Sequence, residues 1–114
     1  MELKTGTLSD LYGKCPYVTT QKLLSGKWTV MILYFLSQGT HRFGELNKKM
    51  NGISQATLTS QLRMLEEAKM IQRIVYAEIP PKVEYRLTDL GKEFSVVLDA
   101  IDSFGNTYIK HVYR

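Results

Sequence analysis

A run of small polar side chains between residues 54 and 63 could contact the edges of DNA bases. Hydroxyl, amide and guanidinium groups stand close together there, at Ser54, Gln55, Thr57, Thr59, Ser60, Gln61 and Arg63, with Ala56 among them. Glutamine can pair with adenine, arginine with guanine or a phosphate, and threonine can contact the thymine methyl group. A polar outward face is also what any surface helix needs, so this run alone leaves both interpretations equally open.

Basic side chains follow in a second stretch, residues 73–86. Lys82 comes directly after Pro80 and Pro81, and Arg73 and Arg86 lie in the segments on either side. Because proline fixes φ and has no N–H to donate, the two prolines predict a stiff loop that holds Lys82 outward. Cations on such a loop would meet phosphates at little conformational cost. Arg42 completes the set of candidate DNA contacts.

Cys15 is the only cysteine and precedes Pro16, a residue suited to the first turn of a helix. A helix N-terminus favours the reactive thiolate, and Lys14 and Lys22 would add to that effect, so Cys15 is a candidate redox sensor. Free cysteines are, however, commonly buried and inert. One cysteine per chain excludes an intrachain disulfide and any zinc site with two or more cysteine ligands. We expect neither a metal nor a cofactor.

Composition limits the class of protein. The chain has 114 residues, 44% of them hydrophobic and 23% charged, which suits a single globular domain. Fifteen Lys and Arg against eleven Asp and Glu give a net charge of +4, which is compatible with a polyanionic partner and equally with an ordinary basic surface. No run approaches a membrane span, and the polar start is unlike a secretory signal, so we expect a cytoplasmic protein.

Hydrophobic spacing predicts four helices in the first part of the chain. The first covers residues 16–24, and the second, largely buried, begins near Trp28 and ends at Gly39. Trp28 is assigned to packing. A third helix holds Phe43, Leu46 and Met50 before the Asn51-Gly52 turn. Ser54 caps the fourth, whose inward stripe comprises Leu58, Leu62 and Leu65.

A β-hairpin and one long helix should follow. Segments 71–78 and 83–88 alternate and are rich in β-branched and aromatic residues, with the prolines in the loop between them. Thr88 or Asp89 can cap a last helix with a long apolar stripe, formed by Leu90, Phe94, Val97, Leu98, Ile101, Phe104, Tyr108 and Ile109. A helix of about 20 residues runs roughly 30 Å, the diameter of a small domain, so its far end needs a partner.

This order of elements predicts an α+β, mostly helical fold, a winged helix-turn-helix with a two-stranded wing and terminal dimerisation helices. We expect one domain over residues 1–114. Residues 1–14 form a flexible arm and the start of the dimerisation region, and residues 88–113 form the C-terminal dimerisation helix. In such a fold the helix after the turn enters the major groove of double-stranded DNA, and the wing reaches the neighbouring backbone or minor groove.

The sequence closely resembles the HxlR-type family of bacterial winged-helix transcription regulators, a relative of the MarR group. The matching blocks are "CP" at 15–16, "GKW" at 26–28, "RFGEL" at 42–46, "GIS" at 52–54, "LTSQLRMLEE" at 58–67 and "PPKVEYRLTDLG" at 80–91. The resemblance implies a homodimer on operator DNA, with Ser54 to Arg63 in the groove and the terminal helices at the interface. Interface residues would be Leu98, Ile101, Phe104, Tyr108 and Ile109. Some family members sense oxidants or electrophiles through a cysteine beside this proline.

Other functions stay open at this point. The chain shows no paired carboxylates in a recognisable cleft, no Cys-His-Asp spacing and no phosphate-binding glycine loop, so we expect no enzyme. A winged helix could instead bind another protein. A regulator of this kind could also respond to an unidentified small molecule at the dimer interface.

Overall fold

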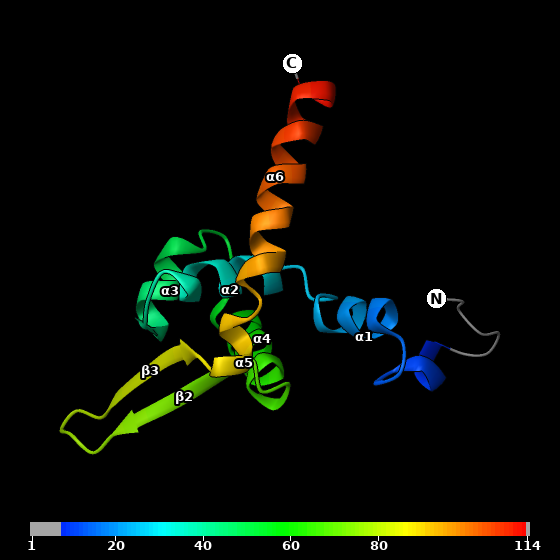
Figure 1. Cartoon of the computed structure of the whole chain (residues 1–114). Coiled ribbons are helices and arrows are strands. Elements are labelled where there is room, and N and C mark those ends of the chain that lie inside the picture. The colour runs from blue at the N-terminus through cyan, green and yellow to red at the C-terminus, as the bar shows by residue number, and fades with distance from the viewer. Residues whose placement is uncertain (1–7, 114) are drawn as a thin grey trace.

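The computed structural model describes residues 8–113 and contains six α-helices, a 3₁₀ helix and three strands within that range (Figure 1). Residues 1–7 of the expected arm lie outside the described residues. The elements follow in the order η1 Leu8–Leu11, α1 Pro16–Leu23, α2 Thr29–Ser37, β1 His41–Arg42, α3 Phe43–Lys49, α4 Gln55–Glu67, β2 Ile71–Tyr76, β3 Lys82–Leu87, α5 Asp89–Lys92 and α6 Ser95–Val112. The predicted mostly helical α+β fold is confirmed.

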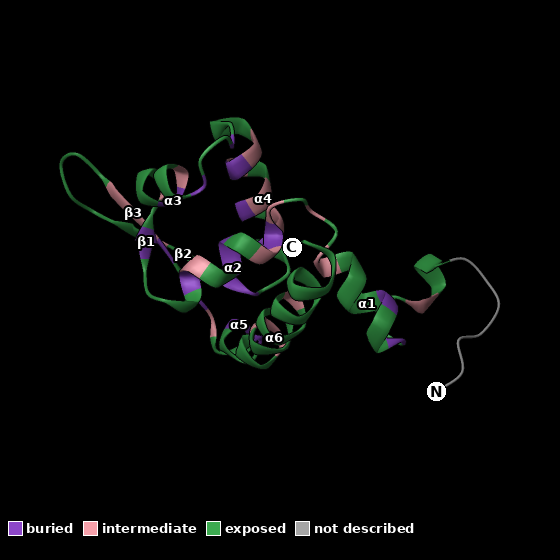
Figure 2. Ribbon diagram, turned by 90° about the horizontal axis from the view of Figure 1, so that it is seen from above, coloured by how far each residue is buried: buried purple, intermediate pink, exposed green. Residues whose placement is uncertain are grey.

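The core lies between α2, α3, α4 and the sheet. The inward stripe of α4, formed by Leu58, Leu62 and Leu65, is completely or almost completely buried, as its spacing predicted. It belongs to one cluster with residues of α2, α3, the strands and the chain after them, including Ile32, Leu33, Leu36, Leu46, Ile71, Tyr85 and Phe94. In Figure 2 buried segments of α2, α4 and the strands face the middle of the body. Burying one such aliphatic side chain contributes roughly 1.5–3 kcal/mol.

A tight turn joins α3 to α4. Gly52 has a φ of +97°, a region that glycine enters without the steric cost of a Cβ. The Asn47 side chain donates to the Ile53 carbonyl across the turn at 3.4 Å. Ser54 then caps α4, since its Oγ accepts the Thr57 N–H at 3.1 Å. The two helices therefore form the expected helix-turn-helix unit.

The sheet has a third strand that the sequence did not reveal. β2 and β3 pair along their full length as the two-stranded wing, and the short strand β1 pairs with the other edge of β3. His41 of β1 is buried, and its Nδ1 lies 2.7 Å from the Gly39 carbonyl oxygen. Its Nε2 lies 2.7 Å from Lys49 Nζ on α3, so Nδ1–H donates and Nε2 accepts. This histidine ties β1 to the helix-turn-helix unit.

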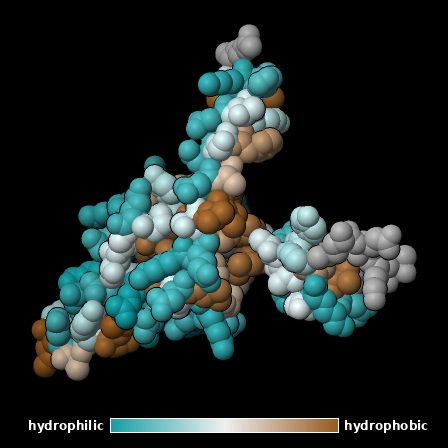
Figure 3. Space-filling view, viewed as in Figure 1, coloured by the Kyte–Doolittle hydropathy of each residue, from teal (hydrophilic) through white to brown (hydrophobic). Residues whose placement is uncertain are grey.

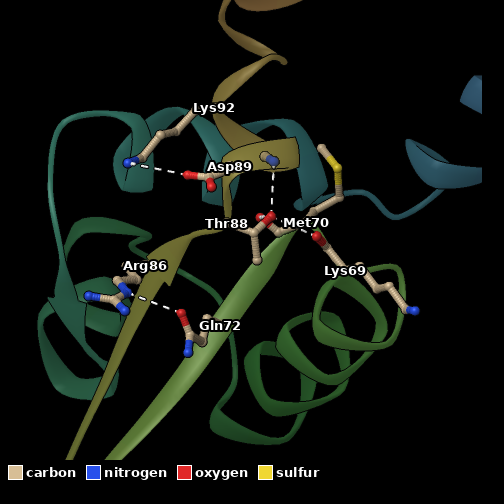
Figure 4. A network of polar contacts seen from close by, with 8 residues as sticks. Lys69, Met70, Gln72, Arg86, Thr88, Asp89 and Lys92 are labelled. Atoms are coloured by element: carbon tan, nitrogen blue, oxygen red, sulfur yellow. Dashed lines mark hydrogen bonds and ion pairs between the residues drawn. The ribbon is translucent and has the colours of Figure 1, made fainter.

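The expectation of one long C-terminal helix is wrong, because the chain forms α5 and α6 with a turn at Glu93 and Phe94. The N–H groups of these two residues donate to carbonyls three positions earlier, which tightens the backbone, and Phe94 is buried in the core. Thr88 caps α5 as expected: its hydroxyl accepts the Gly91 N–H at 3.0 Å and donates to the Lys69 carbonyl at 2.7 Å (Figure 4).

The two ends of the described chain project from this body. In both ribbon views α1 stands to one side of the core, and in Figure 1 α6 rises away from it. Residues 8–11 are not part of a loose arm: they form η1, and the Cys15 N–H donates to the Leu11 carbonyl at 2.8 Å. None of the helices between residues 8 and 113 has the length and apolar character needed to cross a membrane.

Gly91 offers a test of the packing at the base of the wing. A Cβ at this position would collide with the Met70 carbonyl oxygen, a backbone atom that cannot move away cheaply. We expect Gly91→Ala to lower the free energy of unfolding by about 1–3 kcal/mol in urea titrations. The matched control is Gly44→Ala on the exposed side of α3, where a Cβ meets nothing within 4 Å. That variant should be unchanged or more stable by up to about 1 kcal/mol, and equal unfolding midpoints for the two variants would contradict this account.

Candidate nucleic-acid interface

The outward face of α4 is the centre of the candidate site. With the leucine stripe turned inward, Gln55, Ala56, Ser60 and Arg63 are exposed, and Thr57 and Thr59 lie half-buried at the borders of this face. The helix therefore has the orientation that its spacing predicted. Because the side chain of Ala56 is only a methyl group, the helix backbone could approach a ligand closely there.

Some polar side chains of this face make internal hydrogen bonds, and others make none. Ser54 Oγ donates to Thr57 Oγ1 at 2.8 Å besides capping the helix, and Thr59 Oγ1 donates to the Gln55 carbonyl at 2.8 Å. Within residues 8–113, no hydrogen bond or ion pair holds the side chains of Gln55, Ser60 and Arg63. These three side chains can bind a ligand without breaking an internal bond.

Gln61 does not belong to the outward face, contrary to the sequence interpretation. It is half-buried, and its Oε1 accepts a hydrogen bond from Thr29 Oγ1 on α2 at 3.0 Å. Thr29 is completely buried, and a Cβ on Gly26 would collide with the Gln61 amide. The absence of a side chain at Gly26 makes room for this link, which fastens α4 to the start of α2.

Arg73 is the strand residue that joins the α4 face. In the register of the wing it lies opposite Tyr85, so both share the face of the sheet turned toward α4. A hollow of about 370 Å³ between helix and sheet is lined by Thr59, Arg63, Glu66, Arg73 and Tyr85. Two guanidinium groups from different elements thus lie around one depression, beside the available groups of α4.

Arg86 lies on the opposite face of the wing. It is paired with Gln72, and its Nε–H donates to Gln72 Oε1 at 3.2 Å (Figure 4). Arg42 pairs in register with Glu84, which shares that face with Arg86. Arg42 is exposed, and its backbone N–H donates to Glu45 Oε1 at 2.7 Å, a bond that lowers the pKa of the Glu45 carboxyl. The candidate arginines therefore form two separate groups.

Lys82 is not held outward at the loop, so that expectation is wrong. It is the first residue of β3, with its Nζ 4.8 Å from the centre of the Tyr76 ring and 3.6 Å from Glu84 Oε2. Only 27% of its side chain is exposed. The hydrogen bond between Tyr76 and Glu84 raises the pKa of the tyrosine. Stacking and ion pairing inside the wing thus hold the lysine back from the tip.

The wing tip carries a group that sequence reasoning missed. Ile79, directly before the two prolines, is fully exposed. Its position in the loop was visible in the sequence, because the strand alternation ends before it.

The expected interface residues of α6 become more exposed with distance from the core. Leu98 packs partly against the core, whereas Ile101, Phe104, Tyr108 and Ile109 are exposed, and no residue of α6 is classed as buried. Phe104 and Tyr108 stack with ring centres 6.0 Å apart. Between α2 and α6 lies a hollow of about 490 Å³ with a mostly apolar lining that includes Met31, Tyr34, Leu98 and Ile101.

Cys15 occupies the N-cap position of α1 and is 96% buried, with 4% of its surface exposed. The thiol lies at the start of α1, which stands beside the body in Figure 1.

Trp28 packs against the core, as expected, with Lys27 Nζ 5.2 Å from its ring centre.

Comparison with known proteins agrees with this geometry. The model of the HxlR-like helix-turn-helix family matches residues 23–113. The HTH-type transcriptional regulator YtcD of Bacillus subtilis is 43% identical over 94 residues, 82% of this chain and 75% of that protein. A crystal structure of YtcD superposes with a TM-score of 0.81 at 40% identity, covering 84% of this chain and 98% of the other.

Two further solved structures are similar to this chain. The redox regulator HypR in its oxidised form has a TM-score of 0.76 at 35% identity, covering 82% of this chain and 96% of that one. The reduced transcriptional regulator YodB from B. subtilis has a TM-score of 0.74 at 30% identity, covering 82% and 93%. These relatives are transcriptional regulators and not enzymes, which confirms the expectation from the sequence that the protein is not an enzyme. The chain belongs to the HxlR-like helix-turn-helix family of transcriptional regulators.

Proposed function

We propose that the protein is a sequence-specific transcriptional regulator that binds a near-palindromic operator as a homodimer. Its family supports a DNA-binding regulator in general. The observation that carries the specific proposal is the outward face of α4, where Gln55, Ser60 and Arg63 are exposed and unpartnered within the described chain. Groups that are free and held on a rigid helix suit direct contact with base edges.

In the proposed complex, α4 lies in the major groove. Gln55 and Arg63 contact bases, Ser60 and the borders of the face at Thr57 and Thr59 contact bases or phosphates, and Ser54 and Ala56 lie close to the backbone. Arg73 reaches the phosphates beside α4, since it lines the same hollow as Arg63. Arg42, Lys82 and Arg86 contribute mainly to the long-range field, because Glu84 lies among them on the other face.

The homodimer rests on the exposed apolar side of α6. Phe104 is 69% exposed, and Ile101, Tyr108 and Ile109 are exposed on the same helix. Covering these apolar side chains with a second copy lowers the free energy. Two-fold symmetry would place two α4 helices about 34 Å apart, one turn of DNA. The operator would then consist of two inverted half-sites.

Cys15 is the proposed redox sensor, and the similarity to the redox regulator HypR supports this. With one cysteine per chain, oxidation by diamide would join two Cys15 thiols of different protomers, or Cys15 and a small thiol, in a disulfide. Two thiol protons and two electrons pass to diamide, which becomes the hydrazine. Because the thiol is buried, α1 must move before Cys15 can react.

Two other functions have weaker support. The hollow between α2 and α6 could hold a small apolar effector next to the proposed interface. A protein-binding module would use the same α4 face, but its affinity would depend little on salt, whereas phosphate contacts make DNA binding fall steeply as salt rises.

Arg63 tests base contact on α4. We expect Arg63→Ala to weaken binding to a selected genomic fragment by about 1–3 kcal/mol and to relax base preference at one position. Fluorescence anisotropy of purified protein with labelled fragments, at several salt concentrations, measures both. Arg63→Lys keeps the charge but loses the planar fork, so it should bind better than Arg63→Ala and still more weakly than the wild type if the contact is to guanine. Full affinity in both variants would place the contact elsewhere.

Phe104 tests the dimer. A carboxylate at this position would have to be desolvated in the interface, so Phe104→Glu should be monomeric in analytical ultracentrifugation at concentrations where the wild type is dimeric. Asn106→Glu is the matched control, because two residues along a helix is roughly the opposite side. The control should stay dimeric. Equal sedimentation of both variants and the wild type would contradict the proposed interface.

Cys15→Ser tests the sensor. The wild type should lose operator binding after diamide treatment and regain it with dithiothreitol, whereas Cys15→Ser should bind equally in all three conditions. Non-reducing electrophoresis and mass spectrometry identify the disulfide formed. Equal loss of DNA binding by the wild type and by Cys15→Ser would show that the thiol is not the sensor.

A further inference from the structure

A hollow of about 840 Å³ lies at the base of the wing. Its walls are the end of α2, the loop before β1, the neighbouring ends of β2 and β3, and α5. The exposed apolar tip of the wing, which Figure 3 shows at its far end, is at the opposite end of the two strands. Ligand sites in proteins have volumes of about 300–1,000 Å³, so the hollow is large enough for a small organic molecule.

This hollow is separate from the proposed DNA surface. Gln72 and Arg86, which line it, form one cross-strand pair, and Arg73 and Tyr85, which face α4, form the next. Successive residues of a strand point to opposite faces of the sheet. The hollow therefore lies on the face opposite α4, and contact of α4 with DNA would leave it open to solvent.

The Arg86 guanidinium is held in place but keeps donors for a ligand. Its Nε–H donates to Gln72 Oε1 at 3.2 Å, and within residues 8–113 this arginine makes no other hydrogen bond or ion pair. Its two Nη groups and the NH₂ group of Gln72 are therefore available to donate. A guanidinium whose plane is fixed in this way matches the two oxygens of a carboxylate.

Lys92 supplies a second cation from another wall of the hollow. Its Nζ lies 4.0 Å from Asp89 Oδ1, 70% of the lysine side chain is exposed, and the aspartate side chain is fully exposed. An exposed ion pair of this kind contributes little to stability, so a ligand can replace it. Figure 4 shows this pair above the pair of Arg86 and Gln72, and both pairs line the hollow. The charged lining thus has two cations and one carboxylate, and it attracts anions.

We propose that this hollow binds a small organic dicarboxylate. One carboxylate accepts hydrogen bonds from Arg86 and Gln72, and the other pairs with Lys92. Leu36 and Leu87, two core residues that also line the hollow, contact the apolar part of the ligand between its acid groups. An inorganic anion would leave these leucines in contact with water, so the lining favours an organic acid. The site goes beyond the proposed DNA binding and does not depend on it.

Isothermal titration calorimetry of the full-length protein with phthalate, at constant ionic strength, tests the site. Phthalate has two carboxylates on a flat apolar ring, and its neutral diamide, phthalamide, is the control ligand. We expect saturable binding of phthalate by the wild type and no binding of phthalamide. Arg86→Gln and Lys92→Gln should each weaken phthalate binding by about tenfold or more. Both side chains are exposed, so neither change should disturb folding.

Arg73→Gln is the matched control variant, because it removes the same charge from the opposite face of the wing. It should bind phthalate as the wild type does. The site would be overturned by any of three results: no saturable heat with the wild type, wild-type affinity in Arg86→Gln, or an equal loss in Arg73→Gln. DNA binding by the wild type, measured by anisotropy, is a separate result, and its failure would overturn the proposed function while phthalate binding still supported the dicarboxylate site.

Discussion

Burial of the leucine stripe on α4 is the constraint on which the rest of the structure depends. Because a helix repeats every 3.6 residues, fixing Leu58, Leu62 and Leu65 in the core fixes which side chains face solvent. The bond from Thr29 to Gln61 adds a polar link between α4 and α2. The same apolar contacts that stabilise the domain therefore orient the side chains available to a ligand, and a change in the core would also displace Arg63.

Much of the architecture could be predicted from the sequence, because strong local signals coincided. The Ser54 cap, the glycine turn before it and the spacing of the leucines specified α4, and two alternating segments around the prolines specified the wing. β1 could not be predicted, since two residues are too few to show alternation. The break between α5 and α6 depends on Phe94 reaching the core, a tertiary contact that the continuous apolar stripe concealed.

The candidate site was predicted less completely, for reasons that can be traced to single residues. Gln61 is three residues after Leu58 and one before Leu62, so helical geometry puts it at the edge of the buried face, where its amide needs a partner. Its polarity suggested the opposite side. The sequence places Lys82 beside the prolines, but the Tyr76 ring across the wing and the Glu84 carboxylate on the same strand hold its ammonium group. Charge composition indicates how many cations there are, and only the fold decides which of them are free.

In the proposed dimer, the stability of α6 depends on the concentration of the protein. It is 18 residues long and contains no residue classed as buried, and an isolated helix of this length is only marginally stable in water. If a second copy covers it, as proposed, the outer turns of α6 are stabilised by mass action, in proportion to the logarithm of the protomer concentration. Dilution would then fray this helix while the leucine core stayed folded. The number of copies in a cell would thus set the fraction of chains with a complete α6, before any signal reached the protein.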